Sequence, residues 1–561
     1  MLKNEQIRRM YVIDTTGSME EDIVDIKENL IDYIAIATSS GNTEAPTLGL
    51  ITFKDEEEDQ IESDFVCTNS DLLTLKDKIN DLVAYGGDAC PESSAKALGS
   101  AINYFSSSPN LLVPTPRSIF IHTDAPSNNE GLFNYYTLKA RDKSISVNLI
   151  KTEGCEVDTR KNAIGFTPVY NQKNNKIFTK EQMLEFKNSA AEVYQKVAEN
   201  TGGLNFNVNK HELDKVIPIT LFMSETDTEI IYSQKLPVDS ISTTEHILQV
   251  DSSMSTGKTM IIIKTINEAA LPTITLSRPN GNIVLESDAD VTVNNLSTIV
   301  TYTIDSPTQG DWKVSLSNGT STYLVRAYAQ TDFSIAGLNL LKEAPLNIRQ
   351  VPFIPIDGNP IAGNELLLRV HLTKVPDTLT LKLLSENQTV LSEPVLTLIE
   401  NSTKSYQASI IVPNVNFNIK LEGTLNSSQF QREIPLSLKP TKVKLSFDER
   451  FGFLSYELYG VKAENKTFNI HITNRSTVTT TYAINTNSQQ NYPITVQSQI
   501  IVPAGQTVTV PISVSIPADA IVGSTDEIMI IVEDTNDENN NNYKVANLII
   551  RSENLFKNSF E

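Results

Sequence analysis

The sequence predicts an α/β domain followed by three all-β modules of the immunoglobulin-like sandwich type. Up to about residue 222, short apolar runs alternate with segments of helical periodicity, which is typical of a parallel sheet covered by helices. Beyond that point helical periodicity disappears, and short alternating runs rich in Val, Ile and Thr stand between Pro, Gly, Asn and Asp turns. One of these runs, Val508 to Ile516, alternates so regularly that we expect one face of the strand to be buried.

The first domain is expected to begin with a strand at residues 10–13 and a helix from Glu20 to Ser39, whose apolar residues recur at helical spacing. Further strands are expected at Leu48–Phe53, Ser118–His122, Ser146–Ile150 and Leu204–Val208, and further helices near Leu72–Val83, Ser93–Phe105, Leu132–Asp142 and Glu181–Asn200. The last helix should end at Thr201-Gly202-Gly203, because glycine is favoured just after a helix. This order of elements predicts a parallel sheet.

The turns of the β region place the four domains at residues 1–222, 223–342, 343–440 and 441–561, the last with a short polar tail. In the first β module, Thr273–Ser277 and Asn282–Glu286 flank a Pro279-Asn280-Gly281 turn and predict a hairpin. Trp312, the single tryptophan, is expected to anchor a core, with stacking on a ligand as the alternative. The polar run Asp537–Asn542 is expected to be a hairpin tip without chemistry.

Oxygen-bearing side chains follow the strands of the first domain. Asp14-Thr15-Thr16-Gly17-Ser18 presents one carboxylate and two hydroxyls at alternate positions, and Gly17 can adopt the backbone angles of a sharp turn. Two later loops carry Asp88 and Asp124. Loops at the carboxyl ends of strands meet at one edge of an open α/β sheet, so these groups are expected to converge. Oxygen ligands of this kind suit Mg²⁺, which makes Asp14, Thr16, Ser18, Asp88 and Asp124 the candidate metal ligands.

These segments resemble the von Willebrand factor type A fold, a Rossmann-like fold whose metal-ion-dependent adhesion site follows the pattern Asp-x-Ser-x-Ser, then Thr, then Asp. The first part matches Asp14 to Ser18, and the last matches Asp124. Three further segments look like the hemicentin-type branch of the family, namely Gly86–Glu92, Thr123-Asp124-Ala125 and Gly154-Cys155. The β module that follows is also similar to that branch, because it pairs the Pro-Asn-Gly turn with Gly310-Asp311-Trp312. The resemblance covers about residues 8–220 and implies a bound Mg²⁺, or Ca²⁺ or Mn²⁺ in its place.

The sequence departs from the family pattern at two positions. Thr16 stands where Ser is usual, which keeps the hydroxyl. Asp88 stands where Thr is frequent, and a third carboxylate bound directly would neutralise more of the ion's charge and weaken its attraction for an acidic partner. Direct and water-mediated coordination by Asp88 both stay open. A purely structural domain with a degenerate site also stays open, because polar turns after strands often serve as helix caps.

Composition limits the classes of partner. The 561 residues carry a formal net charge of −22 and a pI near 4.8, so we expect no binding to nucleic acid or to an anionic membrane surface. No stretch approaches the roughly 20 apolar residues of a membrane span, and the segment from Met1 to Asn4 lacks the apolar core of a secretory signal. The expected protein has no membrane span and acts outside the cell or at its surface, with the cytoplasm as the alternative.

Cysteines and Asn-x-Ser/Thr triplets also bear on the compartment. The cysteines, which are Cys67, Cys90 and Cys155, are too few for a disulfide framework. Cys90 and Cys155 stand on loops expected at one sheet edge, so a bridge and free thiols both stay open. Triplets begin at Asn295, Asn318, Asn387, Asn401, Asn426, Asn465 and Asn474, all in the β modules. Export with glycosylation would explain this distribution, as would the abundance of Asn, Ser and Thr there.

Other candidate sites have weaker support. The acidic run Asp55–Asp59 lacks the spaced ligands of a calcium loop, so we expect a solvated tip. The five histidines lack zinc-ligand spacing, and no phosphate-cradling Gly-x-x-x-x-Gly-Lys loop is present. The polar loop Glu156–Lys180 is expected near the metal edge, as a specificity loop or a surface insert. The three site loops carry no general base besides the carboxylates themselves, so an enzyme is not expected.

The sequence therefore favours a metal-dependent recognition or adhesion protein. The cation would keep one coordination position for an oxygen atom of a protein or glycan partner, and the β modules would act as a stalk or as extra contact surface. The alternative is an intracellular scaffold of the type A family that assembles protein complexes.

Overall fold

The structure is a computed structural model that describes residues 9–39, 48–54, 62–65, 69–86, 93–106, 117–125, 127, 130–152, 170–171, 176–177, 193–225, 227–238, 242–266, 270–344, 352–434, 437–448 and 456–552. The chain divides into two compact units. The first comprises residues 1–338, 370–406 and 418–437, and the second comprises residues 339–369, 407–417 and 438–561.

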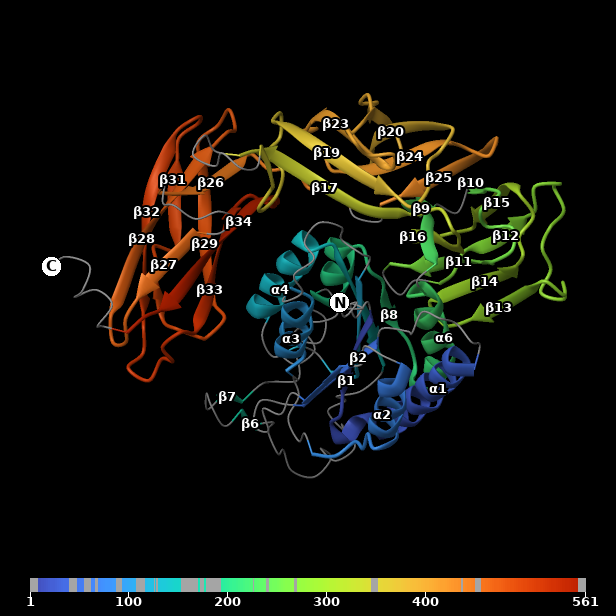
Figure 1. Cartoon of the computed structure of the whole chain (residues 1–561), viewed down its shortest axis with the longest axis horizontal. Coiled ribbons are helices and arrows are strands. Elements are labelled where there is room, and N and C mark those ends of the chain that lie inside the picture. Colours follow the sequence, from blue (N-terminus) through green and yellow to red (C-terminus); the bar gives the residue numbers. More distant parts are fainter. Residues whose placement is uncertain are drawn as a thin grey trace. The chain divides into compact units, whose positions relative to one another are not determined.

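The first unit begins with an α/β domain built on a six-stranded sheet (Figure 1). Its strands in spatial order are β3 (Glu62–Phe65), β2 (Leu48–Phe53), β1 (Arg9–Asp14), β4 (Arg117–Thr123), β5 (Ile145–Lys151) and β8 (Asn205–Asn207). All neighbouring strands from β2 to β8 pair in parallel, as expected, but β3 pairs with β2 antiparallel at the edge. The predicted parallel sheet is therefore confirmed, and the antiparallel edge strand β3 was not predicted because Glu62–Phe65 lacks the apolar run by which the other strands were recognised.

The helices of this domain are α1 (Glu20–Ser39), α2 (Asn69–Asn80), α3 (Ser94–Ser106), α4 (Glu130–Asp142) and α6 (Leu213–Met223), with short 3₁₀ turns η1 (Gly17–Met19) and η3 (Lys210–Glu212). The bounds expected for the first helix are confirmed. Residues 193–201 are helical too, at the end of the helix expected over Glu181–Asn200. The α6 helix was not predicted. Within the described part of the chain, no helix combines the length and apolar character needed to cross a bilayer.

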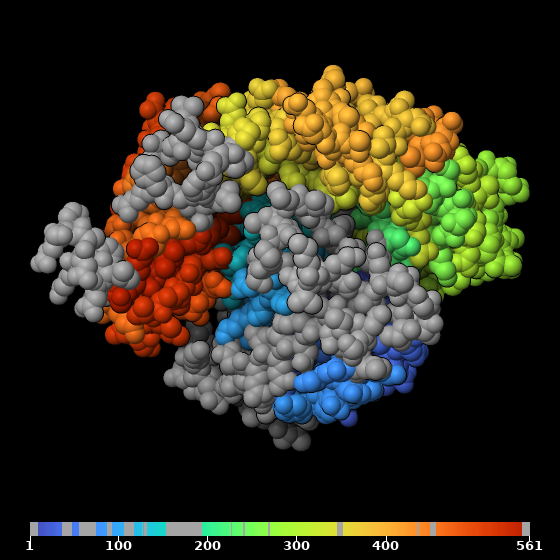
Figure 2. Space-filling model, viewed as in Figure 1, coloured from blue at the N-terminus to red at the C-terminus, as the bar shows by residue number. Residues whose placement is uncertain are grey.

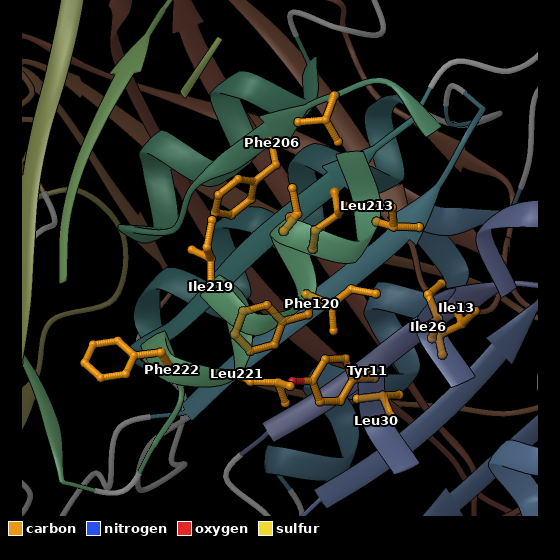
Figure 3. Packing of buried hydrophobic residues seen from close by; sticks show 14 of the residues in the cluster. Tyr11, Ile13, Ile26, Leu30, Phe120, Phe206, Leu213, Ile219, Leu221 and Phe222 are labelled. Carbon is orange, nitrogen blue, oxygen red and sulfur yellow. The ribbon is translucent and has the colours of Figure 1, made fainter. Parts of the chain in front are cut away.

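Apolar side chains of α1, α2 and α6 pack against one face of the sheet. Ile26 and Leu30 of α1 are at most 2% exposed and belong to one cluster with Tyr11 of β1 and Phe120 of β4. The Tyr11 and Phe120 rings stack with their centroids 5.3 Å apart (Figure 3). The opposite face is covered by α3, which contacts β1, β2 and β4, and by α4, which contacts β5. Helices on both faces of the sheet therefore hold in place the strand ends from which the polar loops begin.

The first β-sandwich shares its core with the α/β domain. Buried Met260, Ile262 and Leu324 belong to the same cluster as α6. One sheet contains β10 (Thr244–Val250), β15 (Gly310–Ser317) and β12 (Thr273–Ser277), and the other contains β13 (Val291–Asn295), β14 (Ile299–Asp305), β11 (Lys258–Thr265), β16 (Ser321–Gln330) and β9 (Thr228–Val238). Trp312 is 1% exposed, and its indole Nε1 donates a hydrogen bond to the Thr308 carbonyl at 2.8 Å. The prediction that this tryptophan anchors a core is confirmed.

The hairpin expected in this sandwich is only partly present. The turn forms as expected: Gly281 has φ +85, and the Arg278 N–H donates to the Asn282 carbonyl at 2.8 Å. The second arm is not a strand, since the segment 282–286 makes a single bridge, between Ser277 and Ile283. The first arm, β12, also pairs with β15. The predicted hairpin is therefore confirmed at its turn and over the first residues of its arms, where the Val284 N–H donates to the Leu276 carbonyl at 2.8 Å, but its second arm is not a regular strand.

The second β-sandwich contains a four-stranded sheet that belongs to the first unit. Its strands are β21 (Val390–Ser392), β20 (Thr378–Ser385), β24 (Phe417–Leu425) and β25 (Ser428–Glu433). A further sheet has the order β18 (Phe353–Pro355), β17 (Ile335–Glu343), β19 (Glu365–Leu372), β23 (Ser405–Ile411) and β22 (Thr397–Leu398), and the division between the units passes through its strands. In Figure 2 the green surface of the first sandwich adjoins the yellow and orange surface of residues 370–406 and 418–437, which belong to the same unit.

The third sandwich belongs to the second unit. One sheet contains β26 (Val443–Phe447), β28 (Asn465–Asn474), β32 (Thr507–Ser515) and β30 (Ile494–Thr495), and the other contains β27 (Tyr456–Gly460), β34 (Asp537–Ile550), β33 (Thr525–Asp534), β29 (Thr480–Ser488) and β31 (Gln499–Val502). The alternation predicted around Val508–Ile516 is confirmed, because Val510, Ile512 and Val514 are at most 1% exposed.

The polar run Asp537–Asn542 is not the hairpin tip that its composition predicts. It forms the first part of β34, and Asn542 is only 4% exposed. The Asn542 Oδ1 accepts a hydrogen bond from the Asn359 N–H at 2.9 Å, and its Nδ2 donates to the Val443 carbonyl at 2.8 Å. These buried asparagines therefore tie β34 to neighbouring segments of the second unit.

Candidate functional site

Asp14 ends β1 and is fully buried. Its Oδ1 accepts hydrogen bonds from the Thr16 N–H at 3.0 Å and from Thr16 Oγ1 at 2.7 Å. Its Oδ2 accepts a hydrogen bond from Thr123 Oγ1 at 2.7 Å. Thr123 ends β4, the parallel neighbour of β1, so the register of the sheet places both groups at one edge.

Ser18 joins the two loops. Its Oγ donates to Asp124 Oδ1 at 3.2 Å and lies 3.3 Å from Thr16 Oγ1. Asp124 is fully buried, whereas Ser18 is exposed, so the group of oxygens reaches the surface on the Ser18 side. The structure thus brings together four of the candidate ligands, Asp14, Thr16, Ser18 and Asp124.

The loop that carries Asp88 begins next to the first loop. The Gly17 N–H donates to the Gly86 carbonyl at 2.8 Å, and a Cβ at Gly17 would lie 3.2 Å from that oxygen. Asp88 itself lies outside the described residues. So do Cys67, Cys90, Cys155, the acidic run 55–59 and most of the Glu156–Lys180 loop, in which β6 (Tyr170–Asn171) and β7 (Lys176–Ile177) are described.

Two further charged residues at this edge were not predicted from the sequence. Asp22, in the first turn of α1, is fully buried and accepts a hydrogen bond from Thr152 Oγ1 at 2.7 Å. Lys210 places its Nζ 3.7 Å from Asp22 Oδ2 and 3.8 Å from Asp124 Oδ2, and the same Nζ donates to the Ser18 carbonyl. Neither residue has a sequence signal, because Asp22 reads as one of three acidic residues at a helix start and Lys210 comes from a distant turn.

Burial dominates the electrostatics of this edge. It raises the pKa of Asp14 to about 7, although hydrogen bonds from Thr16 and Thr123 oppose the effect. It raises the pKa of Asp22 to about 6, against the hydrogen bond from Thr152 and the charge of Lys210. Burial raises the pKa of Asp124 as well, against the Ser18 hydrogen bond and the same lysine. Ionising all three carboxyl groups beside Lys210 and Lys151 leaves an excess of negative charge that a bound cation would relieve.

The donor atoms fit a small hard cation. They are carboxylate and hydroxyl oxygens, the ligands that Mg²⁺ and Ca²⁺ prefer. Asp124 Oδ2 and Asp22 Oδ1 are buried and have no hydrogen-bond partner within the described residues, although Lys210 Nζ lies 3.8 Å from Asp124 Oδ2. In the described ranges no three His, Cys, Asp or Glu side chains cluster as a metal-binding group. A site here therefore depends on the hydroxyls as well as on Asp14 and Asp124.

The family comparison agrees with this geometry. Residues 9–210 match the von Willebrand factor A domain family. Residues 9–210 form a von Willebrand factor A domain. Asp14, Thr16, Ser18, Thr123 and Asp124 all lie within the matched range, so the resemblance noted in the sequence and the α/β fold expected from it are confirmed. Residues 441–549 match the IG-like fold at the C-terminal of FixG, which confirms the immunoglobulin-like character of the last module.

Individual relatives of this A-domain protein are distant. Hemicentin-1 of Mus musculus is 20% identical over 355 residues, which is 62% of this chain, and the chain spans only 5% of that protein's length. The von Willebrand factor type A structure from Catenulispora acidiphila is 10% identical, covers 73% of this chain and 67% of its own, and superimposes with a TM-score of 0.28. Proximal thread matrix protein 1 from the mussel byssus, solved with a zinc-occupied MIDAS motif, is 11% identical, covers 42% of this chain and 50% of its own, and gives a TM-score of 0.26. Scores this low carry no argument about shared function.

Proposed function

We propose that this protein is a metal-dependent recognition or adhesion protein, which binds a protein or glycan partner through a divalent cation held by its A domain. The observation that carries the proposal is the convergence of Asp14, Thr16, Ser18 and Asp124 at one sheet edge, where their carboxylate and hydroxyl oxygens contact one another. Membership of residues 9–210 in the A-domain family supports it. The β-sandwiches would act as a stalk or as additional contact surface.

The proposed ligands are Asp14, Thr16, Ser18, Asp88 and Asp124, and the preferred ion is Mg²⁺, with Ca²⁺ or Mn²⁺ as substitutes. When bound, the ion would offer one coordination position to an oxygen atom of the partner. The chain's own residues prepare that position. Thr16 and Thr123 hold both oxygens of Asp14 in place, and exposed Ser18 marks the side from which a partner can approach.

A cation-binding measurement tests this proposal. Titration calorimetry with Mg²⁺, Mn²⁺ and Ca²⁺ should give saturable binding for the intact chain. Asp14→Ala and Asp124→Ala should each weaken binding by about 100-fold or more, since each removes a charged ligand or the hydrogen bonds that orient its neighbours. Asp77→Ala is the matched control, because Asp77 is an exposed carboxylate on α2 of the same domain.

Folding must be checked in parallel, since Asp14 is buried. Far-ultraviolet circular dichroism and the thermal midpoint in EDTA would establish that each variant is folded. Equal heats for wild type, Asp14→Ala and Asp124→Ala, with all three folded, would remove the basis of the metal-dependent function.

The extracellular or cell-surface location is part of the proposal, and an intracellular scaffold is the alternative. Six of the seven triplet asparagines are exposed, namely Asn295, Asn318, Asn387, Asn401, Asn426 and Asn465. Asn474 is fully buried, and its Nδ2 donates to the Val478 carbonyl at 2.8 Å, so this position is closed to a glycan. If the protein is exported through a glycosylating pathway, mass spectrometry should find sugar at some of the six exposed sites and none at Asn474. Glycan on Asn474 would contradict the packing of this sandwich.

A further inference from the structure

We propose that a second site, in the first unit and remote from the metal edge, binds a small organic amine. It is a cavity of about 230 Å³ at the amino-terminal ends of β4 and β5, lined there by Arg117, Ser118 and Ser146. The metal edge lies at the carboxyl end of β4, beyond Thr123. The starts of β9 and β17 and the end of β25 supply the rest of its lining. The proposal goes beyond the metal-dependent function and does not rest on it.

Two glutamates give the cavity its chemical character. Glu433, at the end of β25, is 5% exposed, and its Oε2 accepts a hydrogen bond from the Ser233 N–H at 2.7 Å. Its Oε1 is buried and has no hydrogen-bond partner among the described residues. Glu229, from β9, lines the same cavity. Leaving a buried carboxylate oxygen without a hydrogen-bond donor costs free energy. A ligand that donates a hydrogen bond to Glu433 Oε1 would remove this cost.

The cationic side chains near the two glutamates contact other groups: Arg432, near Glu229, pairs with Asp251, and Lys420, near Glu433, pairs with Glu422. Arg326 donates from Nη1 to the Gly202 carbonyl at 2.9 Å and from Nε to Ser233 Oγ at 3.1 Å. Arg117 donates from Nη1 to the Phe105 carbonyl at 2.6 Å, and its guanidinium lies 5.5 Å from the Phe105 ring centroid. When both glutamates are ionised, the charged residues that line the cavity, Glu229, Glu433 and Arg117, carry a net negative charge. An ammonium group, with its donors and positive charge, is therefore the complementary ligand for Glu433.

The remaining wall favours an organic amine over a bare metal ion. Phe120, Met223, Ile230, Ile335 and Leu338 line the cavity with apolar surface. Ser118 Oγ and Ser146 Oγ lie 2.9 Å apart and supply hydroxyls at the far end of the sheet. Since a water molecule occupies about 30 Å³, the cavity has room for on the order of seven heavy atoms, the size of a short alkylamine or diamine. Carboxylates beside apolar walls suit a ligand with a charged end and a hydrocarbon body.

Calorimetric titration at pH 8 in EDTA tests the site with 1,4-diaminobutane, butylamine and butyrate as probes. We choose pH 8 because burial raises the pKa values of Glu229 and Glu433 to about 7, so both are then mainly ionised. The amines should bind saturably, and butyrate should not. Glu433→Gln should weaken amine binding at least tenfold, and Glu229→Gln should weaken it in the same direction. Glu245→Gln, an exposed change in the first sandwich, should leave it unaltered.

The two proposals fail separately. Asp14→Ala should bind amines as the wild type does, because its carboxylate belongs to the opposite edge of the sheet. Absence of saturable amine heat in folded wild type, or unchanged affinity in folded Glu433→Gln, would overturn the amine site and leave the metal proposal intact. Equal binding of butyrate and butylamine would overturn it as well, because the proposed selectivity rests on charge.

Discussion

Replacing Arg432 with methionine is expected to lower the free energy of unfolding of the first unit by about 3 to 5 kcal/mol. The Arg432 and Asp251 side chains are both fully buried, and Arg432 Nη1 lies 2.7 Å from Asp251 Oδ2. Removing the arginine leaves an ionised carboxylate in the interior without its partner. Breaking a buried ion pair by removing one partner costs more free energy than replacing both partners with apolar residues, because the remaining charge stays desolvated without compensation.

The guanidinium also satisfies acceptors from several elements. Its Nε donates to the Phe333 carbonyl at 3.0 Å, and its Nη2 donates to Thr331 Oγ1 at 3.2 Å. The Phe333 and Phe430 rings lie 5.1 and 5.8 Å from its central carbon. Arg432 belongs to β25 of the second sandwich, whereas Asp251 follows β10 of the first. The Arg432–Asp251 ion pair therefore connects these two sandwiches, and its loss should destabilise both.

Urea unfolding of the full chain, followed by tryptophan fluorescence from Trp312, would measure the effect on this unit. Asp251→Asn should also destabilise it, and the Arg432→Met/Asp251→Asn double variant should cost less than the sum of the single changes, because neither charge is then left alone. Lys313→Met is the control, since its pair with Glu245 is exposed and should contribute about 1 kcal/mol or less. A urea midpoint of Arg432→Met equal to that of Lys313→Met would contradict the stabilising role assigned to the Arg432–Asp251 ion pair.

Strongly periodic elements of the A domain were predictable from the sequence. Ile23, Ile26, Leu30 and Ile34 of α1 all face the core at 3% exposure or less, so a single apolar stripe defined the helix. The unpredicted α6 has no such stripe. It is apolar on most sides because it packs between the sheet and the first sandwich, and Pro218 within it reads as a helix breaker.

Strand arms that depend on tertiary pairing were harder to predict. Asn282–Glu286 alternates like a strand, yet Ile283 and Leu285 are 58% and 56% exposed, so the face of the segment that carries them is not buried. The Asp537–Asn542 run was judged by its polarity, but side-chain amides can be buried when backbone groups satisfy them, as the contacts of Asn542 illustrate. Local sequence carries no information about either outcome.

The candidate site also contains residues that the sequence predicted and residues that it did not. Asp14, Thr16 and Ser18 lie within one turn and Asp124 follows a recognisable strand, so their convergence was predictable from the order of strands. Asp22 and Lys210 complete the charge distribution from α1 and η3, and only the fold brings them within 3.7 Å. The contacts of Lys210 with Asp22 and Asp124 thus join residues that lie far apart in the sequence of the A domain.

Glu433→Gln is expected to stabilise the protein at pH 8 and to have little effect at pH 5, when measured in EDTA without added amine. Burial raises the pKa of Glu433 to about 7, against the favourable charges of Lys420 and Arg326 and with Glu422 adding to the rise. Arg117 and Glu229 are the other charged groups that line its cavity. Glutamine keeps the shape of the protonated carboxyl group and cannot ionise.

The sign follows from the two pKa values. In the unfolded chain the carboxyl group titrates near its ordinary value of 4.5, so the folded state holds the proton more tightly. Its contribution to stability is complete below pH 4.5 and is lost as the pH rises through 7. The loss corresponds to at most about 3 kcal/mol, which Glu433→Gln should restore at pH 8.

Thermal midpoints of wild type and Glu433→Gln between pH 5 and pH 8 would check this expectation. Asp14 and Asp22 have raised pKa values in the same window, but they are present in both proteins and cancel in the difference. Glu245→Gln controls for removal of a negative charge at an exposed position of the first unit. A difference between wild type and Glu433→Gln that stays constant between pH 5 and pH 8 would contradict the raised pKa of Glu433 in the folded protein.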